Sequence, residues 1–177
     1  YTQHDAITTR ISGSRFVDEP YSILLEGTKP VGHRYVFIFG VRTPRMIEQL
    51  DEILSDVEEI ADKRFEAHGA FNIHWHRFGK DAVLQGSEMA ANVAPREVGV
   101  VADVVAETAD LAHDIALDLQ TRVSFWRYPG RYTTAGNMAM TLSPASLNGG
   151  PVYEFSIYHP IQTDDYREVF RRQIIEV

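Results

Sequence analysis

Two histidines, His74 and His76, are separated by one residue in the run Phe71–Phe78 (FNIHWHRF). Apolar and polar residues alternate along this run, which predicts a strand with both histidines on one face. A carboxylate from the neighbouring strand, Asp103 or Glu97, would complete a set of two imidazoles and one carboxylate, which is typical of zinc or non-haem iron sites. The metal hypothesis therefore places a divalent ion, the one cofactor considered, on His74, His76 and Asp103. The alternative interpretation is that the histidines are two polar residues on an exposed sheet face, because an H-x-H pair is a common pattern.

A second candidate site is the long loop expected over Arg127–Gly150. Loops of this length without secondary structure are uncommon in compact domains and are usually functional or disordered. Gly130 and Gly136 permit turns whose N–H groups can hold a carboxylate or phosphate, and Arg127 and Arg131 can clamp such an anion. The candidate ligand-binding residues are Arg127, Tyr128, Gly130, Arg131, Thr133, Thr134, Gly136, Asn137 and, from another loop, Lys80. The competing interpretations are a packed Ω-loop and, for the lysine, a solvated side chain.

The composition excludes several classes of partner and of catalytic group. The chain has 177 residues with 17 Lys plus Arg against 25 Asp plus Glu, and the formal net charge of -8 disfavours nucleic acid and anionic membranes as partners. The absence of cysteine excludes a thiol nucleophile and a disulfide framework, and it fits a reducing compartment such as the cytoplasm. No nucleophile elbow, dinucleotide fingerprint or phosphate-binding loop motif occurs, so catalytic residues stay unassigned.

The elements that must position these residues follow from the hydrophobic pattern. Apolar residues at three- and four-residue spacing predict one helix that starts at Thr43-Pro44, with the Thr43 hydroxyl as its cap, and another that Thr108 caps. β-forming runs predict the strands of one sheet. These are Arg34–Phe39, with both faces covered, then Phe71–Phe78, Glu97–Val105 and Val152–His159. Two further N-terminal strands, Ile7–Val17 and Tyr21–Leu25, precede a loop at Glu26–Pro30, and a short C-terminal piece, Asp164–Ile175, is expected to be helical.

The order strand, helix, strand, strand, helix, strand predicts an α+β fold. Because both β-α-β connections must cross right-handedly, the simplest solution is a ferredoxin-like split βαβ sandwich (β-α-β-β-α-β). It has four antiparallel strands in the order 4-1-3-2 and both helices on one face. Residues 1–30 are expected to form an N-terminal strand arm and residues 31–177 the domain. The alternative, a doubly wound three-layer α/β domain, needs more helices than the pattern predicts.

Several stretches together resemble a known family. They are SGSRFV (Ser12–Val17), LLEGTKPVGHRYVFIFGVRTP (Leu24–Pro44), REVGVVADVVAETADLAHDIA (Arg96–Ala116) and, most distinctively, YPGRYTTAGNMAM…LSP…GGPVYEFSIYH within Tyr128–His159. They are similar to the C-terminal part of the acyclic terpene utilisation protein A family, also described by the domain of unknown function 1446. One departure is Met138-Ala139-Met140-Thr141, where a Leu-Ala-Phe-Pro-like run is expected, and it changes the shape of any apolar pocket there.

The resemblance implies a role in bacterial catabolism, since family members are associated with operons that include degradation of acyclic terpenes through CoA thioesters. This chain would then be the C-terminal domain of a longer protein and would help to form a site for an acidic or CoA-linked small molecule. The first residue, Tyr1, leads to the same expectation of a longer chain. The expected partners are the preceding domain of its own chain and a small-molecule ligand. The parent chain could be an enzyme of terpenoid or organic acid catabolism, whereas the fragment alone is not expected to be catalytic.

The alternative function is a non-catalytic oligomerisation or ligand-sensing module. Sandwiches of the expected type often associate through an open sheet face or an edge strand. The aromatic face of the last strand, with Tyr153, Phe155 and Ile157, and the edge candidate Phe71–Phe78 favour a homo-oligomer. A third hypothesis, a stand-alone metalloenzyme, rests on His74 and His76 only.

Overall fold

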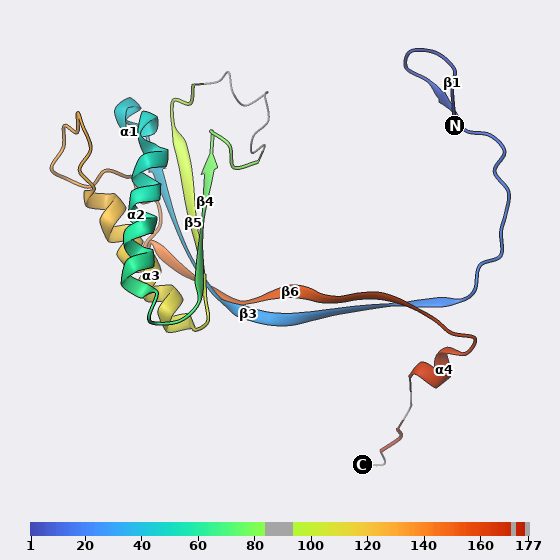
Figure 1. Cartoon of the computed structure of the whole chain (residues 1–177). Helices are drawn as coiled ribbons and strands as arrows, with labels where there is room; N and C mark the ends of the chain where they lie inside the picture. Colours follow the sequence, from blue (N-terminus) through green and yellow to red (C-terminus); the bar gives the residue numbers. More distant parts are fainter. Residues whose placement is uncertain (84–93, 171–172, 176–177) are drawn as a thin grey trace. The chain divides into compact units, whose positions relative to one another are not determined.

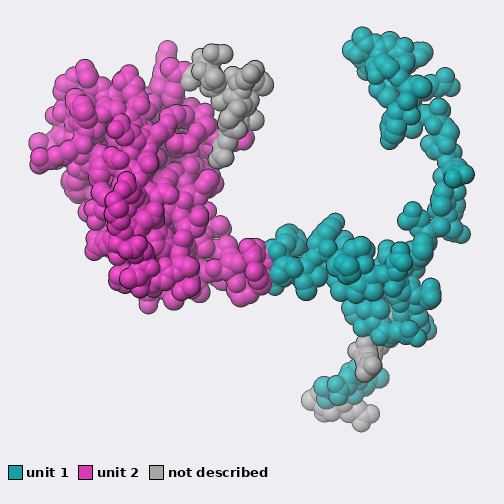
Figure 2. All heavy atoms as spheres, in the orientation of Figure 1, with its two compact units in different colours: residues 1–28, 155–177 teal, residues 29–154 magenta. Residues whose placement is uncertain are grey.

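The computed structural model describes residues 1–83, 94–170 and 173–175 (Figure 1). They form two compact units, residues 29–154 and residues 1–28 together with 155–177 (Figure 2). From the sequence, residues 1–30 were expected to form an arm, and residues 155–177 were placed with the domain of residues 31–177. In the structure these residues group with residues 1–28, since the last strand pairs with the first long strand there: the N–H of Thr163 donates to the carbonyl of Tyr21 over 3.2 Å.

The main sheet has four strands, and the chain is α+β as expected. The strands are β3 (Ser22–Val41), β4 (Phe71–Phe78), β5 (Val98–Ala106) and β6 (Ser146–Gln162), in the spatial order β4-β5-β3-β6. β5 pairs antiparallel with both β3 and β4, and the contacts of β6 with β3 run in opposite directions along the two strands. A separate two-stranded sheet joins β1 (Thr2–Gln3) to β2 (Thr9–Arg10).

Two long helices cover the same side of the sheet (Figure 1). They are α2 (Leu50–Phe65) and α3 (Ala109–Phe125), while α1 (Pro44–Glu48) and α4 (Tyr166–Val169) are short. Their buried side chains recur at helical spacing, which is the amphipathic pattern that the sequence shows. The buried stripe comprises Leu50, Ile53, Leu54, Val57, Ala61 and Phe65 on α2 and Leu111, Ala112, Ile115, Ala116, Leu119 and Val123 on α3.

The core lies between these helices and one face of the sheet. Alternate residues of β5 are fully buried, among them Val100 and Val104, and Phe37 and Phe39 of β3 lie on the same face. Burial of each large apolar side chain contributes roughly 1.5–3 kcal/mol. β3 was expected to be covered on both faces, but Ile38 between the two phenylalanines is only half-buried. The helices therefore cover one face only, and in the described residues no helix covers the other.

Three local expectations were wrong. The Glu26–Pro30 loop is part of β3, since β6 continues alongside and the ammonium of Lys29 pairs with Glu154 at 2.8 Å. The Ile7–Val17 strand is reduced to Thr9–Arg10 of β2. The Thr43 side chain makes no cap hydrogen bond, and its carbonyl accepts from the first N–H groups of α1 instead. Thr108 does cap α3, because its hydroxyl accepts from the N–H of Leu111 at 3.2 Å.

The loop before the last strand is shorter than expected. β6 starts at Ser146, so the strand already includes Gly149 and Gly150. Gly149 lies against the aliphatic part of the Arg34 side chain, where an added Cβ would come within 2.9 Å of Cγ, so the arginine covers the strand at this point. Of the helices in the described part of the chain, none has the length and apolar character needed to cross a membrane.

Candidate functional site

The candidate site is built on the loop that follows α3. Tyr128 attaches this loop to the core, since its side chain is buried among the apolar residues. The next turn packs against α1: the side-chain amide of Gln49 donates to the carbonyl of Pro129 at 3.2 Å. Gly130 has a φ of 80°, and a Cβ there would lie 2.6 Å from Cδ of Arg45. A glycine therefore permits both the left-handed turn and the close approach of the α1 arginine.

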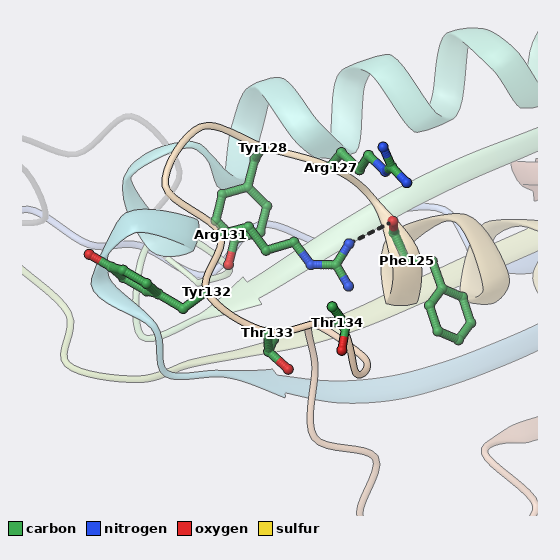
Figure 3. A pocket seen from close by; sticks show the side chains of 7 residues that line it. All are labelled: Phe125, Arg127, Tyr128, Arg131, Tyr132, Thr133 and Thr134. Atoms are coloured by element: carbon green, nitrogen blue, oxygen red, sulfur yellow. Dashed lines mark hydrogen bonds between the residues drawn. The ribbon is translucent and has the colours of Figure 1, made fainter.

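Arg131 holds the end of α3. Its guanidinium donates to the carbonyls of Phe125 at 3.1 Å, Trp126 at 3.3 Å and Ala135 at 2.7 Å, and Figure 3 shows it reaching back to Phe125. The last carbonyls of a helix have no partner within the helix and carry a partial negative charge, so a cation stabilises them. Arg131 thus has a structural role that was not anticipated from the sequence.

Asn137 completes this arrangement from the other end of the loop. Its amide nitrogen donates to the carbonyls of Val123 at 3.0 Å and Trp126 at 2.8 Å, and its main-chain N–H donates to Ser124 at 2.8 Å. The neighbouring Ala139 forms a β-bridge with Gly40 of β3. The loop is therefore closed onto α3 and the sheet, and its polar residues largely serve its own backbone.

A pocket of about 470 Å³ remains open on this loop (Figure 3). Its lining includes five of the nine predicted ligand-binding residues, together with two aromatic residues that the prediction did not include. The lining residues are Phe125, Arg127, Tyr128, Arg131, Tyr132, Thr133 and Thr134. This volume lies in the range of small-molecule sites, roughly 300–1,000 Å³. Among these described lining residues there is no carboxylate and no imidazole.

The electrostatics of the loop are opposite in sign to those of the whole chain. Arg127 lines the pocket, Arg131 contacts main-chain carbonyls, and Arg45 packs on Gly130. Within the described residues, none of these three arginines is paired with a carboxylate. In addition, Nε of Arg131 is buried and has no hydrogen-bond acceptor there. A protein with a net charge of -8 thus carries a local, unneutralised positive region beside a pocket.

The remaining predicted ligand-binding residues lie elsewhere. Gly136 and Asn137 line another pocket of about 440 Å³, which also includes Arg42 and Glu97. Lys80 forms an ion pair with Asp51. This pairing agrees with the plain structural interpretation of that lysine rather than with a role in the loop pocket.

The Lys80 ammonium also affects the pKa of its partner, Asp51. Partial burial would raise the pKa of Asp51, but the hydrogen bond from Lys80 and the positive charges of Arg77 and Lys80 outweigh it. The pKa of this carboxyl group is therefore lower than its ordinary value. The Asp51 carboxyl group is accordingly ionised at neutral pH.

The predicted metal residues share the open face of the sheet but do not form a metal site. His74 lies opposite Asp103 in the β4–β5 ladder, and the rings of His74 and His76 are 4.4 Å apart. The Asp103 carboxylate, however, accepts a hydrogen bond from Nε of Arg34 at 2.8 Å, while Nε2 of His76 is 3.9 Å from it. In the part of the chain that the structure describes, no three potential ligands come close enough to hold a metal ion. One oxygen of the Asp103 carboxylate is therefore already used by Arg34.

A further pocket, of about 360 Å³, lies at the β4 edge and contains a carboxyl group with a shifted pKa. Partial burial raises the pKa of Glu58 above its ordinary value of about 4.5, although a hydrogen bond from the indole N–H of Trp75, 2.9 Å long, opposes this shift. The nearby Asp62 adds to the increase and His74 opposes it. The folded chain therefore binds a proton at Glu58 more readily than the unfolded chain does.

This shift makes a prediction about stability. Glu58→Gln is expected to raise the free energy of unfolding at pH 7 by about 0.5 kcal/mol after solvent screening, because the amide still accepts from Trp75 but carries no partly buried charge. In the wild type, stability should rise as the pH falls through the raised pKa toward 4.5, and the variant should lose this dependence. Urea unfolding at pH 5 and pH 7 measures both effects.

The adjacent residue supplies a control of opposite sign. A hydrogen bond from Lys63 and its positive charge lower the pKa of Glu59, so Glu59→Gln should reduce stability at pH 7. A lower stability of Glu58→Gln than of the wild type at pH 7 would contradict the assignment.

The sequence analysis did not identify Arg45 as part of the candidate site. Its proximity to Gly130 depends on how α1 packs on the loop, and no local pattern signals that contact.

No family model, curated protein or solved structure matches this chain. The function must therefore be inferred from the site itself.

Proposed function

We propose that this chain binds a small anionic molecule at the loop pocket, as the C-terminal domain of a longer catabolic protein that resembles the acyclic terpene utilisation family. The observation that carries the proposal is a set of arginines unpaired with carboxylates beside a pocket of about 470 Å³ in an acidic protein. Carboxylate and phosphate groups are the partners that a guanidinium binds most strongly. The ligand class is therefore an organic acid or a CoA-linked acid.

Each part of the pocket has a role in this proposal. Arg127 has no hydrogen-bond or ion-pair partner in the described residues and supplies a free guanidinium. The buried Nε of Arg131 is a donor without an acceptor there, which costs about 1–3 kcal/mol unless an acceptor occupies the site. The hydroxyl groups of Thr133 and Thr134 can donate to further ligand oxygens, and the ring of Tyr132 can contact an acyl chain.

The lining favours binding rather than catalysis. General acid–base chemistry most often uses an imidazole or carboxyl group, and the described lining residues include neither, although they do include the phenol groups of Tyr128 and Tyr132. We therefore propose that the fragment recognises the ligand while the reaction, where the parent chain performs one, takes place with residues of the preceding domain.

The strand order and the two helices on one face support the finer fold proposal, a ferredoxin-like split βαβ sandwich. A cytoplasmic location is part of the same proposal, supported by the absence of cysteine.

The experiment that tests the function is an anion titration of the purified chain, followed by NMR shifts and calorimetry. The probes are coenzyme A, acetate and inorganic phosphate. Arg127→Gln is expected to weaken the binding of the tightest probe by about 10- to 100-fold, since it removes one charge-assisted hydrogen-bonding group. The matched control is Arg96→Gln, because Arg96 is also an exposed arginine without a partner in the described residues but does not line the pocket.

Two results would contradict the proposal. The first is the absence of binding by all three probes at millimolar concentrations. The second is an equal loss of affinity in the two variants, which would show that the anion responds to overall charge and not to this pocket.

A further inference from the structure

The smaller unit contains a two-stranded ribbon, which consists of the β3 residues before residue 29 and the β6 residues from residue 155 onward. A Cβ on Gly27 would lie 3.3 Å from the Ile157 side chain, so these two residues point to the same face of the ribbon. Because side chains alternate along a strand, Ile23 and Leu25 share that face on β3. Phe155, His159 and Ile161 share it on β6. We call Ile23, Leu25, Phe155, Ile157, His159 and Ile161 the apolar ribbon face, in which His159 is the polar member.

The burial pattern supports this assignment. Along β3, Ile23, Leu25 and Gly27 are partly buried, whereas the residues between them are exposed. The opposite ribbon face is more polar and includes Glu26 and Tyr158. The ribbon is thus amphipathic, which is the pattern of a sheet with one face packed against another layer.

In the described residues this face lacks such a layer. Phe155 is 70% exposed and Ile157 is 50% exposed. Among the residues whose burial the structure describes, the buried apolar ones lie between Phe37 and Tyr128, so the described part of the smaller unit contributes none of them. Two strands alone are at best marginally stable in water, because they cannot bury enough apolar surface. Ile11 and Phe16 of the N-terminal segment are exposed as well.

We propose that the apolar ribbon face is a self-association surface, and that its partner is the same face of a second copy of this chain. In a two-fold symmetric contact each residue near the axis meets its own copy, so a charged side chain there would face a like charge. The apolar ribbon face contains no Asp, Glu, Lys or Arg, and two chains of net charge -8 can approach each other best through such an uncharged surface.

The composition also separates a second copy from other classes of partner. The face has no lysine or arginine, so it offers little to nucleic acid or to anionic lipid. Interfaces between identical subunits are more apolar than those between transient partners. This inference is independent of the proposed ligand pocket, which lies in the other unit.

The test is sedimentation of the purified chain at concentrations from micromolar to millimolar. The wild type is expected to dimerise, and Phe155→Glu is expected to weaken dimerisation at least 100-fold, because it buries a charge in each half of the contact. Tyr158→Glu is the matched control: Tyr158 lies on the same strand, is 71% exposed and points to the opposite face, so the control should dimerise like the wild type. An unchanged thermal unfolding transition shows that the core of the larger unit is intact in both variants.

A second measurement uses the absence of cysteine in the chain. Ile157→Cys introduces a single thiol on the apolar ribbon face, and a short bismaleimide should link two copies efficiently, whereas Tyr158→Cys should link them poorly. A wild type that remains monomeric at millimolar concentration would overturn the proposal and would leave another domain as the partner of the face. Dimers that are insensitive to Phe155→Glu would also overturn it, because association would then use another surface, such as the β4 edge.

Discussion

The substitution Gly32→Ala is expected to destabilise the folded chain by about 4 kcal/mol and to lower its melting temperature by about 10 °C. A Cβ at Gly32 would lie 2.4 Å from the carbonyl oxygen of Ala106 and 3.2 Å from Cγ1 of Val105. The nearest atom belongs to the backbone, so no side-chain rotation relieves the overlap. The φ of 154° at Gly32 adds to the cost, since residues with a Cβ rarely adopt it.

The position in the sheet explains the size of this effect. The next residue, His33, pairs with Ala106 at the end of the β3–β5 ladder, so any shift of the backbone there disturbs the pairing that supports the core. Urea and thermal unfolding measure the loss. Gly99→Ala is the matched control in the same sheet, because a Cβ there would be at an ordinary distance of 3.8 Å from Cβ of Phe78. The control should be neutral or slightly stabilising. Similar stabilities of the two variants would contradict the prediction.

The second large effect is expected for Asn137→Asp, which should lower the free energy of unfolding by about 3 kcal/mol at pH 7. The amide nitrogen of Asn137 is the donor to the carbonyls of Val123 and Trp126. A carboxylate cannot donate, so both carbonyls lose a partner and face a negative charge at the negative end of the α3 dipole. The loop should also open, and trypsin should then cleave after Arg127 and Arg131 faster than in the wild type.

The pH dependence of the stability of Asn137→Asp identifies the cause of its loss. The carbonyl groups favour the neutral form of the introduced carboxyl, so its pKa in the folded chain should lie above its value in the unfolded chain. The folded variant then takes up a proton first, and its deficit relative to the wild type should shrink as the pH falls through that raised pKa. Asn137→Ala should lose stability without this pH dependence.

An exposed asparagine supplies the control for the change in charge. Asn148 accepts a hydrogen bond from the N–H of Gly150 at 2.8 Å through its side-chain oxygen, which a carboxylate can also do. Asn148→Asp should therefore be close to neutral. A pH-independent loss in Asn137→Asp would show that the helix end is not the reason for the effect.

Local sequence patterns predicted the elements whose cause is short-range. The strand Phe71–Phe78 has the predicted bounds, because its alternation of apolar and polar residues is continuous. The cap at Thr108 was also predicted, since a hydroxyl next to the first helical N–H groups acts within one turn. The expectation of a loop at Glu26–Pro30 failed because the glycine and proline of that segment are typical of loops, whereas the pairing with β6 outweighs this local preference.

In the candidate site, too, local patterns predicted the segment, whereas the roles of its residues depend on long-range contacts. The composition and length of the loop after α3 indicated a functional segment, and the pocket is found there. The roles within it were not predictable, because Arg127 and Arg131 have the same chemistry in the sequence. Only the folded chain shows that Arg131 is used by the carbonyls at the end of α3, while Arg127 remains without a partner among the described residues.

The sequence by itself determined the α+β class, the two amphipathic helices, the overall charge and the segment that carries the pocket, because these depend on composition and on periodicity over a few residues. Among the described residues, the tertiary structure decided which arginine has no partner, that Asp103 is paired with Arg34, and which ribbon face is left uncovered. These properties depend on contacts between residues far apart in the chain, and the energy of such contacts is defined only when the strands and helices pack.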